Sequence, residues 1–120
     1  MARILVVDDS PYFRARTRAV LESRGHEVSE ARDVHDAVAS VHRERPDAVV
    51  FDLIVPDQDA LDLLQELRRH GFDGPRVVVT ADRQSMTRHL ALAHGATAYL
   101  TEPVEPATLI EHVEEAAILV

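Results

Sequence analysis

The chain has 120 residues, of which 46% are hydrophobic, a size and composition typical of one folded domain rather than of a disordered segment. The absence of cysteine excludes disulfides and thiolate metal sites and fits a reducing compartment, while a net charge of −8 without a basic stripe disfavours direct binding to nucleic acid. No apolar run is long enough to span a membrane and the first residues do not follow the plan of a signal peptide, so we expect a cytoplasmic protein with no membrane segment.

The first half of the chain alternates short apolar runs with amphipathic helical patterns. The run at 3–7 is continuous and rich in β-branched residues, which is typical of a strand buried on both faces. A helix is predicted next, with Ser10 able to cap its start and Gly25 suited to its end. The pattern then predicts a second strand at 26–31 and a second helix that Pro46 ends.

The second half continues the alternation through three more strands and three more helices. The predicted strands are 47–53, 76–81 and 97–100, and the predicted helices are 59–71, 85–95 and 106–120. In the first of these helices Leu61, Leu64 and Leu67 recur on one face. No linker or repeat interrupts the pattern, so we expect one domain over residues 1–120.

Strands that alternate with helices of this length predict an α/β fold, with a parallel sheet covered by helices on both faces. Because crossover connections are right-handed, few strand orders remain, and we expect a flavodoxin-like (βα)5 fold of order 2-1-3-4-5. Ligands bind such folds outside the carboxyl ends of the strands. The residues expected at those ends are Asp8, Asp9, Asp52, Thr80 and Glu102.

Three of these residues suggest a metal site. Asp8 and Asp9 follow the first strand and Asp52 lies in the third, and these two strands are neighbours in the expected order. Carboxylates gathered in one place repel one another, and burying them without a partner costs several kcal/mol each. A hard cation such as Mg²⁺ removes that cost and prefers oxygen ligands. The alternative is that Asp8 and Asp9 form a solvated turn and Asp52 merely ends a strand.

The motifs "LVVDDSP", "VVFDLIVPDQDALDLL", "VVVTA" and "GATAYLTEP" together resemble the CheY-like receiver domain of two-component response regulators. The resemblance covers essentially the whole chain, in order and with the family's spacing. It implies that Asp52 accepts a phosphoryl group from a histidine kinase or phosphotransfer domain. It also implies that Asp9 binds Mg²⁺ directly and Asp8 through water, with Asp52 and the backbone carbonyl of Ile54 as further ligands.

The same resemblance implies a switch and an output surface. Thr80 would hydrogen-bond the phosphoryl group, and Tyr99 would be the aromatic residue that moves inward on activation. The output surface, through which the protein could form a homodimer, would run from the helix at 85–95 to the last helix. It would include Ala91, Leu92, Ala93, Tyr99, Val104 and the apolar end 118–120. We therefore expect a signalling switch and not an enzyme.

Glu102 departs from the family pattern, which has a lysine at this position. The chain contains no lysine, because all 13 of its basic residues are arginines. The reversed charge predicts slow or weak phosphorylation, or poor coupling of phosphorylation to Tyr99. Rotation into solvent, a raised pKa among like charges, or a place in the metal shell would each reduce the repulsion.

Three other functions remain open at this stage. A degenerate receiver would keep the fold and act through protein contacts, without phosphorylation. A flavodoxin would need a hydroxyl- and glycine-rich phosphate loop after the first strand, where Asp8 and Asp9 would repel a phosphate. An aspartate-nucleophile phosphatase would need an Asp-x-Asp motif, but Asp52 is followed by Leu53 and Ile54.

Overall fold

The computed structural model describes residues 1–52, 54–55 and 58–118. The strands are β1 (Arg3–Val7), β2 (Glu27–Ala31), β3 (Ala48–Phe51), β4 (Ile54–Val55), β5 (Gln58–Asp59), β6 (Arg76–Thr80) and β7 (Ala98–Thr101). The helices are α1 (Pro11–Glu22), α2 (Val34–Glu44), α3 (Ala60–Arg69), α4 (Ser85–Ala93) and α5 (Pro106–Ile118). Within this described part of the chain, no helix is long and apolar enough to cross a membrane.

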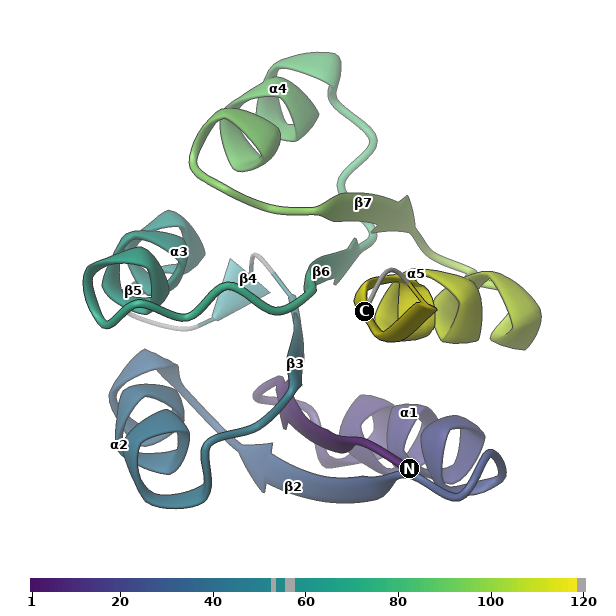
Figure 1. The fold of residues 1–120 in the computed structure, drawn as a ribbon. Coiled ribbons are helices and arrows are strands. Elements are labelled where there is room, and N and C mark those ends of the chain that lie inside the picture. The colour runs from purple at the N-terminus through teal and green to yellow at the C-terminus, as the bar shows by residue number, and fades with distance from the viewer. Residues whose placement is uncertain (53, 56–57, 119–120) are drawn as a thin grey trace.

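Five of the strands form one parallel sheet in the order β2-β1-β3-β6-β7. Since β6 and β7 are the fourth and fifth strands of this sheet, the order is the predicted 2-1-3-4-5. Helices α1 and α5 cover one face, and α2, α3 and α4 lie on the other (Figure 1). The flavodoxin-like fold is therefore confirmed.

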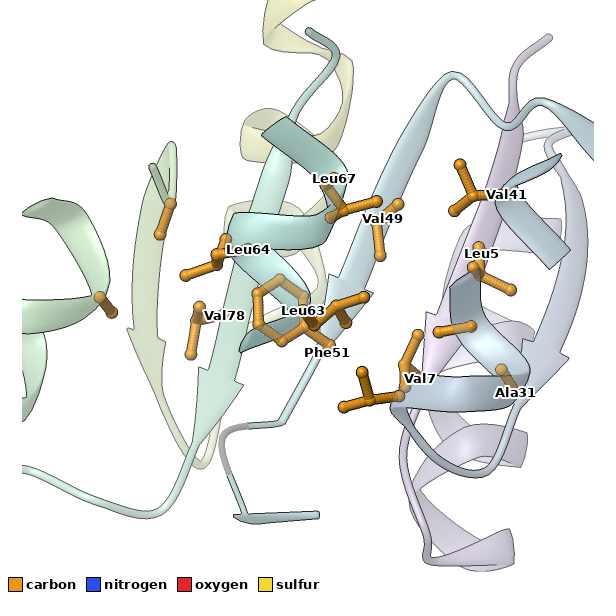
Figure 2. Close-up of a cluster of buried hydrophobic side chains, with 14 of the residues drawn as sticks. Leu5, Val7, Ala31, Val41, Val49, Phe51, Leu63, Leu64, Leu67 and Val78 are labelled. Atoms are coloured by element: carbon orange, nitrogen blue, oxygen red, sulfur yellow. The ribbon is translucent and has the colours of Figure 1, made fainter. Parts of the chain in front are cut away.

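The core is divided by the sheet into two layers, because successive strand side chains point to opposite faces. In β1, Leu5 and Val7 pack with the cluster under α2 and α3, whereas Ile4 and Val6 pack with the cluster under α1 and α5. Figure 2 shows the first cluster, in which Phe51 meets the leucines of α3. Both faces of the strand are buried, which explains its continuous apolar sequence.

Local sequence signals account for the starts of α1 and α2 and for the end of α1. The Ser10 side chain accepts a hydrogen bond from the amide of Phe13 (3.4 Å), and Asp33 accepts one from the amide of Asp36 (2.7 Å). Ser10 therefore caps α1 as expected, and Asp33 caps α2 in the same way. Gly25 follows α1 with a φ of +84°, a conformation that costs other residues more than glycine.

The segment after β3 differs from the prediction. The third strand was expected to reach residue 53 but ends at Phe51, so Asp52 stands just beyond the strand. The chain then forms a small antiparallel pair, in which Ile54 of β4 pairs with Asp59 of β5, before α3 begins. Strands of two residues carry no periodic signal, which is why the sequence did not reveal this pair.

Candidate functional site at the carboxyl edge of the sheet

Asp8 and Asp52 are brought side by side by the register of the two central strands. Val7 pairs with Phe51, and each aspartate is the next residue along its strand. The amide of Asp52 donates a hydrogen bond to the carbonyl oxygen of Val7 (3.2 Å), which continues the ladder past the end of β3. The two acidic residues thus emerge together at the carboxyl edge, where ligands bind in folds of this kind.

Asp8 is the most enclosed of the acidic residues at this edge, with only 8% of its surface exposed. Burial raises the pKa of its carboxyl group to about 6, opposed by a hydrogen bond from the amide of Ser10 (2.9 Å). The charges of Asp52 and Asp9, and a hydrogen bond with the Asp9 side chain, raise the pKa of Asp8 further. Asp9 itself is exposed, and Asp52 is half-buried. Asp8 and Asp52 therefore lie together at this edge, and Asp9 is near enough for its charge and side chain to act on Asp8.

The donor chemistry at this edge fits Mg²⁺ in a partly hydrated form. Within residues 1–52, 54–55 and 58–118, no three His, Cys, Asp or Glu side chains are arranged to hold a metal ion between them. Mg²⁺ does not need such a cage, because it usually keeps several waters and takes one or two carboxylates. The carboxylate of Asp8, which lies among other acidic side chains, and the exposed carboxylate of Asp9 are suited to be those one or two ligands. The carbonyl of Ile54, which lies in β4, stays a predicted ligand.

Thr80 and Tyr99 are joined through the backbone of Asp82. Thr80 ends β6 and is fully buried, and its hydroxyl oxygen accepts a hydrogen bond from the Asp82 amide (3.3 Å). The Tyr99 hydroxyl donates to the carbonyl oxygen of Asp82 (2.7 Å), and burial raises the Tyr99 pKa. Tyr99 lies inward in this structure, and its predicted movement stays a prediction. The link through Asp82 was missed from the sequence because no local pattern encodes it.

Glu102 belongs to the same site. It lines a small pocket at the carboxyl edge together with Asp8 and Asp52. Burial raises the pKa of the Glu102 carboxyl group, the charge of Asp52 raises it further, and the charge of Arg16 lowers it. A raised pKa is one of the three responses expected for a carboxylate among like charges, and its place in a metal shell stays a prediction.

Arginine side chains reach this edge from two other elements. From α1, Arg14 Nη1 donates to the carbonyl oxygen of Asp8 (2.6 Å). From the loop before α4, Arg83 Nη2 donates to the carbonyl oxygen of Glu102 (3.1 Å). The sequence shows that these arginines exist, but their approach to the site depends on how the elements are placed around the sheet.

The predicted output surface is only partly exposed. Ala91 and Tyr99 were expected on it, but both are buried in the core cluster, so that part of the prediction was wrong. Leu92 and Ala93, which were also expected there, are exposed, as are Met86 and Leu90 of the same helix. Residues 119–120 lie outside the described residues.

The fold and the acidic edge define a class of protein: a doubly wound α/β domain with its site at the carboxyl ends of β1, β3, β6 and β7. Residues 4–114 match the family described as the response regulator receiver domain. The chain therefore belongs to this family, whose members act in two-component signalling and interact with kinases or phosphotransfer partners.

Individual relatives agree with this assignment. Protein PilH of Pseudomonas aeruginosa is 35% identical over 113 residues, which are 92% of this chain and 93% of PilH. Response regulator MprA of Mycolicibacterium vanbaalenii is 40% identical over 101 residues, or 84% of this chain but only 44% of MprA. A CheY-like receiver domain structure from Methanospirillum hungatei has a TM-score of 0.91 at 28% identity, covering 99% of this chain and 95% of that one.

Proposed function

We propose that this domain is a Mg²⁺-dependent phosphoryl acceptor of the cytoplasm, a switch and not an enzyme, and that Asp52 receives the phosphoryl group from a histidine kinase or phosphotransfer protein. The observation that carries the proposal is that Asp8 and Asp52 stand next to each other just beyond the paired ends of β1 and β3, where burial and neighbouring charges raise the Asp8 pKa to about 6. An acidic edge of this kind favours a cation and the phosphate that accompanies it.

The transfer itself needs a nucleophile held in position. A carboxylate oxygen of Asp52 forms a bond to phosphorus, the bond from phosphorus to the donor's imidazole nitrogen breaks, and the imidazole keeps that electron pair. When bound, Mg²⁺ neutralises the charge that gathers on the phosphoryl oxygens. The backbone hydrogen bond of Asp52 to Val7 fixes the start of the nucleophile's side chain against β1.

The signal would pass from Asp52 through Thr80 to Tyr99. The Thr80 hydroxyl oxygen only accepts in its hydrogen bond with the Asp82 amide, so its proton remains available to a phosphoryl oxygen. Any movement of Thr80 toward the phosphoryl group disturbs Asp82, whose carbonyl holds Tyr99.

Output would use the surface formed by α4, β7 and α5, through a homodimer or another partner, and the exposed Met86, Leu90 and Leu92 support this. Because Glu102 adds a carboxylate to the pocket, we expect phosphorylation or its coupling to Tyr99 to be impaired.

The test is phosphorylation by acetyl phosphate, a donor that needs no protein partner. The wild-type chain should gain the mass of one phosphoryl group when Mg²⁺ is present and lose that ability with EDTA. Asp52→Asn should gain none. A wild type that stays unmodified, together with an unmodified Glu102→Lys variant, would instead favour a degenerate receiver that acts through protein contacts.

A further inference from the structure

The acidic pocket has a cation beside it that comes from α1. Arg16 lines a groove of about 350 Å³ whose walls also include Glu102, Phe13 and Val79. Glu102 is at the same time part of the small pocket that holds Asp8 and Asp52. Glu102 therefore lines both the groove that Arg16 lines and the pocket that Asp8 and Asp52 line.

The neighbouring arginines are already engaged elsewhere. Arg14 donates to the Asp8 carbonyl and forms an ion pair with Glu30 (3.0 Å), and Arg18 pairs with Glu22 and Glu30. These contacts hold the two side chains against β2 and along α1. For Arg16, no hydrogen bond or ion pair is formed with any residue that the structure describes. Its exposed guanidinium is therefore able to turn toward a new anion at the pocket.

Electrostatics points the same way. Burial and the charge of Asp52 raise the pKa of Glu102, and the positive charge of Arg16 opposes this rise. An ionised Glu102 attracts Arg16 toward the pocket. A phosphoryl group on Asp52 would replace the single negative charge of the carboxylate with about two, next to Glu102, and would strengthen that attraction.

We propose that Arg16 supplies the positive charge at the phosphorylation site. In the family pattern this charge comes from a lysine at the position of Glu102. Here the Glu102 carboxylate holds the Arg16 guanidinium near the pocket. The inference rests on the proposed function of Asp52 as phosphoryl acceptor. Arg16 is a positioning residue for the phosphoryl group in the wild type. In a protein that regains a lysine at residue 102, Arg16 becomes dispensable.

The experiment compares Arg16→Gln with wild type in reaction with acetyl phosphate and Mg²⁺. In this step an Asp52 oxygen forms a bond to phosphorus while the bond to the acetate oxygen breaks and acetate leaves with the electron pair. We expect the rate to fall about tenfold in Arg16→Gln, a smaller loss than for a buried group because the guanidinium is exposed and screened. Arg18→Gln, on the same helix, should react at the wild-type rate. In a Glu102→Lys background, Arg16→Gln should change the rate by less than about twofold.

A second measurement separates this role from a structural one. Fluoroberyllate, an anion that mimics the phosphoryl group, should bind Arg16→Gln about tenfold more weakly than wild type in a ¹⁹F NMR titration. Mg²⁺ binding, measured by calorimetry without fluoroberyllate, should be unchanged or slightly tighter, because a nearby cation has been removed. A merely destabilised site would lose affinity for both probes.

Each other outcome counts against a specific claim. Equal rates in wild type and Arg16→Gln would overturn the role of Arg16 and leave Asp52 as the acceptor. Phosphorylation of Glu102→Lys but not of wild type would also overturn it, since Arg16 would then supply no effective charge. If none of these proteins were modified, the proposed function itself would fail.

Discussion

The backbone amide of Glu102 donates a hydrogen bond to the carbonyl oxygen of Thr80 (2.8 Å). This bond extends the pairing of β6 with β7, in which Thr80 is opposite Thr101. The sheet therefore fixes the backbone of Glu102 beside the threonine predicted to contact the phosphoryl group. Because this backbone is held in place, replacement of the Glu102 side chain changes the charge at the pocket without moving the backbone around it.

Restoration of a lysine at residue 102 should accelerate phosphorylation. In Glu102→Lys a carboxylate whose pKa is raised by burial and by Asp52 is replaced with a cation next to the phosphoryl site. Removal or addition of one well-placed electrostatic group changes rates by about 10²–10³, and we expect an increase of at least about tenfold at this half-buried position. The rate with acetyl phosphate is followed by intact mass.

Glu111→Lys is the matched control for this substitution. It changes the net charge by the same amount at an exposed position of α5, and its rate should stay near that of wild type. If both variants were accelerated equally, a general effect of net charge would explain the result. If Glu102→Lys were no faster than wild type, the carboxylate would not be what limits the reaction.

Asp8 should destabilise the metal-free fold at neutral pH. Its folded-state pKa of about 6 lies above the ordinary value of 3.8, so the folded protein holds the proton more tightly than the unfolded chain between these values. Stability from this group is therefore highest below about pH 4 and falls as the pH rises through about 6. Above that range the cost approaches about 3 kcal/mol, and Asp8→Asn should recover about 1–3 kcal/mol.

Urea unfolding in EDTA checks this expectation. Asp8→Asn should be more stable than wild type at about pH 7.5, and the difference should vanish near pH 4. Asp9→Asn is the comparison, because Asp9 is exposed and its neutralisation should gain much less. A variant Asp8→Asn that is less stable than wild type at neutral pH would show that the ionised carboxylate is well compensated in the fold.

The sequence predicted the parts of this molecule that depend on local pattern. The apolar run of β1 and the caps Ser10 and Gly25 come from side-chain spacing and backbone preference, which neighbouring residues determine. The handedness of the crossovers leaves few strand orders, and the order expected among them is the one observed. Together they bring Asp8 next to Asp52 without any knowledge of the packing.

Other features depend on tertiary placement. The position of Arg16 relative to Glu102 depends on how α1 is rotated on the sheet, and several of the chain's arginines would look equivalent by sequence alone. The bridging role of Asp82 depends on the path of one loop. Ala91 was assigned to the output surface by the family resemblance, and only the packing of α4 on the sheet shows that it belongs to the core.

Tyr99→Phe should loosen the loop after β6 without disturbing the core. The ring is buried, so phenylalanine fills the same space, but the Asp82 carbonyl loses the hydrogen bond from the hydroxyl. Loss of such a bond costs about 0.5–1.5 kcal/mol. Tyr12→Phe is the matched control, because Tyr12 is 67% exposed and should tolerate the change.

Hydrogen exchange localises the effect of Tyr99→Phe. The amides of Asp82 and Gln84 should exchange faster in the variant, since they are held by Thr80 and by the Asp82 side chain within the same loop. Protection of the amides in the central strands from hydrogen exchange should change only as much as the global free energy of unfolding does. An unchanged loop would mean that Tyr99 does not restrain Asp82 and that the proposed path from Thr80 to Tyr99 is wrong.

Mg²⁺ should stabilise the protein in a way that depends on the ionisation of Asp8. A ligand present at about 100 times its dissociation constant adds about 2.7 kcal/mol to the free energy of unfolding. Near pH 7.5 Asp8 is ionised and the gain should be fully present, whereas near pH 5 its carboxyl group is mostly protonated and the gain should shrink. Asp9→Asn should lose most of the gain at both pH values, and Glu111→Gln should keep it. Thermal unfolding with Mg²⁺ and with EDTA measures the difference, and an equal gain in wild type and Asp9→Asn would place the cation elsewhere on this acidic protein.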